Sequence, residues 1–161
     1  MTRASAVRCR GEISFHHLDG QSVFNSPMLA RWAGSREPIE RVSDQNANVQ
    51  LRPGQFTFVY RPEWQIDIFP GENEMLDVAV RFKDEEDCYG WSNDSYLHNW
   101  RIPSRKLAKG RYLVRVKVTS AGQSWEELLR PINDVSIQDF RLIEATPLDH
   151  QNIKAAFETR K

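Results

Sequence analysis

The chain has 161 residues, the length of one ordinary domain with its own hydrophobic core. Hydrophobic residues make up 40% of it and charged residues 27%, values typical of globular proteins, and no run of about eighteen apolar residues predicts a membrane span. The formal net charge is zero, which excludes a strongly basic or acidic protein, but the charges are segregated: residues 63–94 hold ten acids and two bases, and residues 95–125 hold seven bases and no acid.

The N-terminal segment contains arginines but lacks the apolar stretch of a secretory signal. We therefore expect a cytoplasmic protein, or the soluble part of a protein whose membrane anchor lies outside this sequence. The two cysteines, Cys9 and Cys88, are far apart and show no paired spacing. In a reducing compartment they are expected to be buried thiols, and a Cys9–Cys88 disulfide is the alternative.

Apolar and polar residues alternate in several segments, a pattern typical of half-buried strands. In the first of these segments Val7, Cys9, Ile13 and Phe15 are expected to face the core, and in the second Phe56, Phe58 and Tyr60 share one side. In chain order, the predicted strands are residues 7–15, 56–60, 65–71, 75–82, 111–118, 125–130 and 137–144.

Two helices and one long loop complete the prediction. Ser26 followed by Pro27 is typical of a helix start and predicts a short helix over residues 26–34. Thr146, Pro147 and Asp149 predict a C-terminal helix with a near capping box. Its apolar residues are sparse, so we expect it to dock lightly or fray. Residues 34–54 are polar and are expected to form an irregular surface loop.

About seven to eight short strands with little helix predict an all-β fold, an antiparallel β-sandwich. The run KLAKGRYLVRVKV places Leu107, Gly110 and Tyr112 at the start of a strand in an order that resembles the tyrosine corner of immunoglobulin-like domains. The resemblance implies an immunoglobulin-like sandwich in which the Tyr112 hydroxyl bonds to upstream backbone. One domain is expected over residues 1–161, with the sandwich in 1–145 and a helix or tail in 146–161.

The acidic segment DEEDCYGWSNDSYLHNW, residues 84–100, invites a test for metal binding. With Gly90 at the sixth position of a calcium loop, Tyr89 and Tyr96 occupy the fifth and twelfth positions, where oxygen ligands are required. The calcium loop therefore fails, and an irregular site formed by Asp84, Asp87 and Asp94 is the remaining metal alternative. Neither zinc-ligand spacing nor a catalytic motif occurs in the sequence. We expect no enzyme activity, no metal and no cofactor.

Aromatic residues of this segment run directly into the basic block. The strand that follows turns its apolar residues inward, so its cations share the outward face with Leu113. Cations beside aromatic rings suit a ligand that carries phosphates and stackable bases. The predicted ligand-binding residues are Arg101, Arg105, Lys106, Arg111, Arg115, Lys117, Trp91, Tyr96 and Trp100.

These residues also have purely structural interpretations. The cations are alternatively the partners of the acids in residues 63–94, and the tryptophans are alternatively core or rim residues. The leading hypothesis is a non-catalytic sensor domain for an anionic, nucleotide-like ligand. One setting that fits is the cytosolic part of a bacterial membrane-anchored antiviral effector that senses cyclic oligonucleotides. A symmetric ligand of that type would favour a homo-oligomer.

Two further hypotheses belong to other functional classes. A carbohydrate-binding module would stack sugars on Tyr89, Trp91, Tyr96 and Trp100, with Asn93 and Asp94 as hydrogen-bonding partners. A structural or protein-interaction domain would instead use the charge blocks for assembly. Salt separates the nucleotide hypothesis from the carbohydrate hypothesis, because binding through several cations weakens steeply as salt rises and sugar stacking does not.

Overall fold

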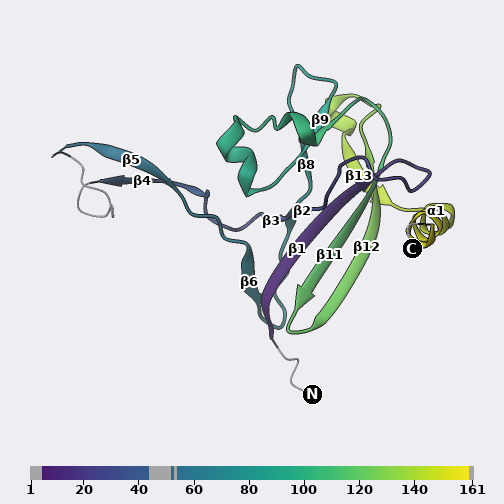
Figure 1. Ribbon diagram of the computed structural model, residues 1–161, viewed down its shortest axis with the longest axis horizontal. Helices are drawn as coiled ribbons and strands as arrows, with labels where there is room; N and C mark the ends of the chain where they lie inside the picture. Colours follow the sequence, from purple (N-terminus) through teal and green to yellow (C-terminus); the bar gives the residue numbers. More distant parts are fainter. Residues whose placement is uncertain (1–4, 44–51, 53, 160–161) are drawn as a thin grey trace.

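The computed structural model describes residues 5–43, 52 and 54–159. Its largest element is an antiparallel sheet, the main sheet, with strand order β13-β12-β11-β1-β2 and with β6 also paired to β1 (Figure 1). The strands of the main sheet are β1 (Ala6–His16), β2 (Met28–Leu29), β6 (Gln65–Ile68), β11 (Leu113–Ser120), β12 (Gln123–Ile132) and β13 (Arg141–Glu144).

The register of the main sheet follows the predicted alternation. Ile13 lies opposite Val116 and Phe15 opposite Val114, so these side chains share the inward face of β1 and β11. β11 and β12 are joined through Ala121 and Gly122, whose positive φ angles of 46° and 81° match the two-residue turn that fits the twist of a hairpin.

A second layer of short strands covers the inward face of the main sheet. β8 (Ala79–Arg81), β9 (Cys88–Gly90) and β10 (Lys106–Leu107) form a three-stranded sheet, and β3 (Arg31–Trp32) pairs with β7 (Leu76–Asp77). The core between the layers consists of Ile13, Phe15, Met28, Ala30, Cys88, Leu107, Tyr112 and Val114.

The predicted all-β class with a C-terminal helix is therefore present, and two facing antiparallel layers are compatible with a sandwich. The described residues form 13 strands rather than seven or eight. One predicted strand is divided, since residues 75–82 form β7 and β8, which pair with different partners. Five further short strands form in segments where no strand was predicted. The single-domain division and the immunoglobulin-like topology stay predictions.

The tyrosine-corner motif forms the hydrogen bond that it implies. The Tyr112 hydroxyl donates to the backbone carbonyl of Ala108 at 2.8 Å, and Leu107 is buried beside it. Asn133, fully buried, donates from its side-chain amide to the carbonyl oxygens of Glu86 at 3.0 Å and Ala108 at 3.4 Å. The corner thus fixes the start of β11 to the second layer.

The helix predicted over residues 26–34 is wrong. Met28 pairs with Ile13 in β2, and Trp32 pairs with Leu76 in β3. Met28, Ala30 and Trp32 are all buried, which is a period-two pattern set by the two flanking layers. Tertiary packing here overrides the local signal of Ser26 and Pro27.

The start of β1 and the state of the two cysteines were both the subject of predictions. Val7 is exposed rather than inward, because Arg8 has a positive φ of 53° and the register with β6 shifts between Ala6 and Cys9. Cys9 and Cys88 are both buried free thiols, as expected, and not a disulfide. Burial raises the pKa of the Cys88 thiol to about 12, so this thiol is protonated at neutral pH.

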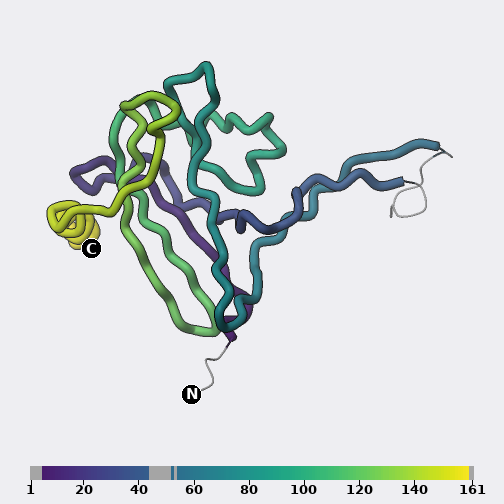
Figure 2. Tube along the Cα trace, turned by 180° about the vertical axis from the view of Figure 1, so that it is seen from behind, coloured from purple at the N-terminus to yellow at the C-terminus, as the bar shows by residue number. Residues whose placement is uncertain are grey.

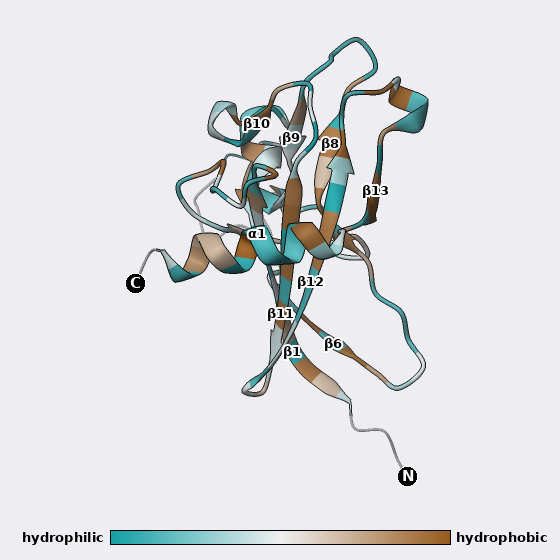
Figure 3. Cartoon of the chain, turned by 90° about the vertical axis from the view of Figure 1, so that its right-hand side faces the viewer, coloured by the Kyte–Doolittle hydropathy of each residue, from teal (hydrophilic) through white to brown (hydrophobic). Residues whose placement is uncertain are grey.

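The C-terminal helix α1 (Pro147–Glu158) begins as predicted, with Thr146 as its N-cap and a capping box to Asp149. It crosses the outward face of β11 and β12 (Figure 3), where Ile153 packs on Leu113 and Leu128. Light docking is therefore wrong: Asp149 is almost fully buried and receives two hydrogen bonds from Arg130 of β12, at 2.6 and 2.7 Å. None of the helices in the described ranges is long and apolar enough to cross a membrane.

The segment predicted as an irregular loop over residues 34–54 contains a strand instead. β4 (Ile39–Ser43) pairs with β5 (Phe56–Tyr60), and together they form a ribbon, here called the arm, that extends away from both layers (Figures 1 and 2). Residues 44–51 and 53 of the predicted loop lie outside the described residues.

Candidate binding surfaces

The segment of residues 84–100 is built around a 3₁₀ helix, Asn93–His98. Ser92 is the N-cap of this helix, and the backbone N–H of Ser92 donates a hydrogen bond to the Ser95 hydroxyl at 3.1 Å. Asn93 is buried and donates to the Glu63 carbonyl at 3.0 Å, which ties the helix to the base of the arm. Within the described ranges no group of acids, histidines and cysteines could hold a metal ion.

The structure brings three of the predicted aromatic residues together. Tyr96 lies between Trp91 and Trp100, with ring centroids 5.6 and 6.4 Å apart. The guanidinium of Arg31 lies 5.5 Å from the Tyr96 ring, so one face of the cluster packs on protein. Tyr89, the fourth aromatic of the carbohydrate hypothesis, is buried against Phe82 and offers no platform for a sugar.

The three predicted ligand-binding cations of residues 101–106, together with Lys109, form salt bridges with the acidic block. Four pairs join the two blocks at 2.6 to 3.1 Å: Arg101–Glu85, Arg105–Asp94, Lys106–Asp87 and Lys109–Glu86. The Lys109 ammonium also holds the pKa of the Glu86 carboxyl below its usual range. Each of these four cations is therefore paired with an acid of residues 63–94, as the structural interpretation predicted.

The remaining predicted cations do not form a continuous stripe. Arg111 precedes β11 and pairs with Asp134 at 2.8 Å, whereas Arg115 pairs with Glu126 at 3.0 Å. Leu113, between them, is fully buried beneath α1. Arg115 and Lys117 follow Leu113 on the same outward face, and the Arg115 guanidinium lies 5.1 Å from the ring of Phe157 in α1. The aromatic cluster belongs to the second layer, on the other side of the main sheet.

A further aromatic surface, outside the predicted ligand-binding residues, lies on the arm. Phe56 and Phe58 are 47% and 65% exposed, and their rings meet edge to face at 5.8 Å. The register places Arg41 opposite Phe58, and its guanidinium lies 3.6 Å from the Phe56 ring. The alternation in FTFVY was a usable signal for this face, but it does not say whether the face is covered.

The base of the arm is fixed to the second layer. The Tyr60 hydroxyl donates to Asp94 at 2.6 Å, and burial together with this carboxylate raises the Tyr60 pKa far above its ordinary value. Arg31, 6% exposed, donates to Asp77 at 2.9 Å and to the Ser35 carbonyl at 2.7 Å. The arm is thus a ribbon held at its root.

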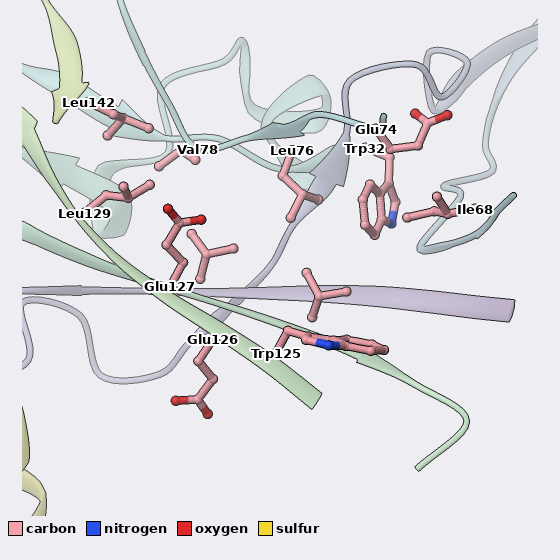
Figure 4. Close-up of a pocket in the computed structure, with 12 residues that line it drawn as sticks. Trp32, Ile68, Glu74, Leu76, Val78, Trp125, Glu126, Glu127, Leu129 and Leu142 are labelled. Carbon is pink, nitrogen blue, oxygen red and sulfur yellow. The ribbon is translucent and has the colours of Figure 1, made fainter. Parts of the chain in front are cut away.

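A pocket of about 430 Å³, here called the apolar cleft, lies between the main sheet and the β3–β7 pair. Trp32 and Ile68 lie on one side of its opening and Trp125 on the other (Figure 4). Trp125 is 51% exposed, whereas Trp32 is buried and its indole N–H has no acceptor among the described residues. The full lining comprises Trp32, Ile68, Glu74, Leu76, Val78, Val116, Val118, Trp125, Glu126, Glu127, Leu129 and Leu142.

The charges of the apolar cleft are all negative. Glu127 projects into the ring of lining residues, whereas Glu126 is directed away from it toward Arg115 (Figure 4). No base in the described part of the chain pairs with Glu127 or Glu74. The cleft therefore suits an apolar occupant that also carries a cation.

Comparisons with protein-family models, curated proteins and solved structures find no match to this chain.

Proposed function

We propose that this chain is a non-catalytic recognition domain that binds another protein through its arm. The observation that carries the proposal is the exposed aromatic pair Phe56 and Phe58 on a ribbon whose root is fixed. Aromatic residues and arginine are the residue types enriched in the energetic centre of protein interfaces, and Arg41 completes such a set here.

The energetics of a two-stranded ribbon support the same proposal. An isolated hairpin is marginally stable in water, and the arm makes no sheet contact with either layer along β4 and β5. The aromatic face of the arm, which includes Arg41, Phe56 and Phe58, has no covering element in the described chain. Burial of this face against a partner would stabilise the ribbon and the complex together.

The test compares proteins that co-purify with the full chain from its native host. Phe56→Ser combined with Phe58→Ser should remove most of the bound partner, because the exposed pair supplies the apolar contact. The matched control is Phe69→Ser, which changes an aromatic residue that is 55% exposed and outside the arm. Recovery of the same partners with the arm variant as with the control would contradict the proposal.

An anionic, nucleotide-like ligand is the second proposal, with its setting in antiviral signalling. The observation that favours it is a polar pocket of about 290 Å³ beside Arg105, lined also by Asn25, Ser26 and Ser104. Against it stands the pairing of Arg105 with Asp94 at 3.1 Å and with the Ser92 hydroxyl.

A thermal-shift series separates the two proposals. The panel contains linear nucleotides and cyclic oligonucleotides, each measured at about 50 mM and 200 mM salt. The protein-recognition proposal predicts no rise in Tm with any of them. A rise that disappears at the higher salt would instead establish the anionic ligand, because phosphate contacts with lysine and arginine weaken steeply with salt.

A further inference from the structure

We propose that the arm of one copy of this chain docks into the apolar cleft of a second copy. The inference rests on the proposed function, since it names the partner of the same arm. Each copy carries one arm and one cleft at different places, so the contact is heterologous and leads to a closed ring or an open chain of copies.

The two surfaces match in chemistry. Directly opposed residues of an antiparallel pair share a face, so the arm presents Arg41 with Phe56 and Phe58 on one side. The apolar cleft offers the exposed ring of Trp125 and the aliphatic floor of Val116 and Val118. Aromatic rings packed on tryptophan and on β-branched side chains bury large apolar areas on both surfaces.

The two surfaces also match in charge. Among the described residues on the aromatic face of the arm, Arg41 is the charged one, and it is exposed. The cleft holds Glu127 within its lining and Glu74 at its rim, neither paired with a described base. Both carboxylates are exposed in the free chain, and a bound arm places the Arg41 guanidinium beside them, so the two surfaces are complementary in charge.

The direction of the arm indicates that it binds the cleft of a second copy and not the cleft of its own chain. The arm leaves the second layer after β3 and extends away from the main sheet, which forms one wall of the cleft (Figures 1 and 2). The contacts of Tyr60 and Arg31 hold the root in that direction. Phe56 and Phe58 of one copy are therefore placed to reach another molecule.

Sedimentation velocity of the full chain over a range of concentrations tests the docking. The unchanged chain should form oligomers as concentration rises. Phe56→Ser with Phe58→Ser, the arm variant, and Trp125→Ser, the cleft variant, should each stay monomeric. The matched controls Phe69→Ser and Trp100→Ser, which change exposed aromatic residues outside both surfaces, should associate like the unchanged chain.

Mixing the two variants gives the sharper result. The cleft variant retains an intact arm and the arm variant retains an intact cleft, so an equimolar mixture should form a one-to-one dimer and nothing larger. In that dimer, Arg41→Glu on the cleft variant or Glu127→Arg on the arm variant should weaken the Kd by about tenfold, as expected for loss of a close charge pair. Both reversals together should restore most of the affinity.

Each contrary outcome overturns the docking. The unchanged chain could stay monomeric at its highest soluble concentration, the oligomer could persist in either variant, or the mixed variants could fail to dimerise while retaining the unchanged chain's circular dichroism spectrum. A monomeric chain whose arm still captures a different protein from its host would overturn this inference and leave the proposed function standing. A monomeric chain with no arm-dependent partner would overturn both.

Discussion

Replacement of Asp149 with asparagine should lower the free energy of unfolding by about 3 kcal/mol at pH 7. Asp149 is 1% exposed, and its carboxylate accepts hydrogen bonds from the Arg130 guanidinium and from the backbone N–H of Thr146 at 2.7 Å. The substitution leaves a mostly buried guanidinium without its counter-charge, and α1 loses its main polar attachment to β12.

The pH dependence of the same variant gives a second readout. The hydrogen bonds from Arg130 hold the pKa of the Asp149 carboxyl at about 2, below its ordinary value of 3.8. A carboxyl with a lowered pKa in the folded state contributes stability that is present above about pH 4 and is lost as the pH falls toward 2. The difference in unfolding free energy between the unchanged chain and Asp149→Asn should therefore shrink over that range.

Urea denaturation at several pH values measures both effects. Asp84→Asn is the matched control, because Asp84 is exposed, and it should change stability by less than about 0.5 kcal/mol. Equal stability of Asp149→Asn and the control at pH 7, or a difference that stays constant from pH 5 to pH 2, would contradict the structural role of the Arg130–Asp149 pair.

Substitution of Gly20 with alanine should destabilise the chain by about 3 kcal/mol, through α1 rather than through the turn itself. Gly20 has a φ of +89°, and a Cβ at this position would lie 2.5 Å from the backbone oxygen of Asn152. The helix would have to shift, which would break the hydrogen bond of 2.8 Å from the Asn152 side chain to the Leu18 carbonyl.

Gly71 supplies a control with the same backbone strain. It has the same φ of +89°, but a Cβ there would meet nothing within 4 Å. Gly71→Ala should therefore cost only the strain of a left-handed alanine, about 1 kcal/mol. Thermal or urea unfolding of the two variants isolates the packing of α1, and equal losses of stability would show that the Gly20 contact with the helix does not matter.

Local signals predicted elements whose cause lies close by in the sequence. Thr146, Pro147 and Asp149 specify the start of α1 because all the groups of the capping box lie within one turn. The firmness with which this helix docks was not predictable, because Arg130 reaches Asp149 from a different element. The same limit explains residues 26–34, where strand partners in β1 and β7 override a local helix signal.

The candidate surfaces show the same division between local and non-local information. The acidic and basic blocks predicted charge pairing in general, but the partners themselves, such as Glu85 for Arg101, depend on the fold. Alternation placed Phe56 and Phe58 on one face of a strand, but only the fold shows that no described element covers that face, which is what suggests the proposed interaction. The apolar cleft joins residues as far apart as Trp32 and Leu142 and has no signature in the sequence.

The proposed function depends on the exposed aromatic face of the arm, so contact at Phe58 is its most direct test. A photo-crosslinking phenylalanine analogue is placed at position 58 of the otherwise unchanged chain in its native host, and at position 69 in a matched chain. We expect covalent adducts with another polypeptide from position 58 and few from position 69. An adduct between two copies of the chain would identify the partner as self. Absence of polypeptide adducts at position 58, or equal yields from both positions, would contradict it.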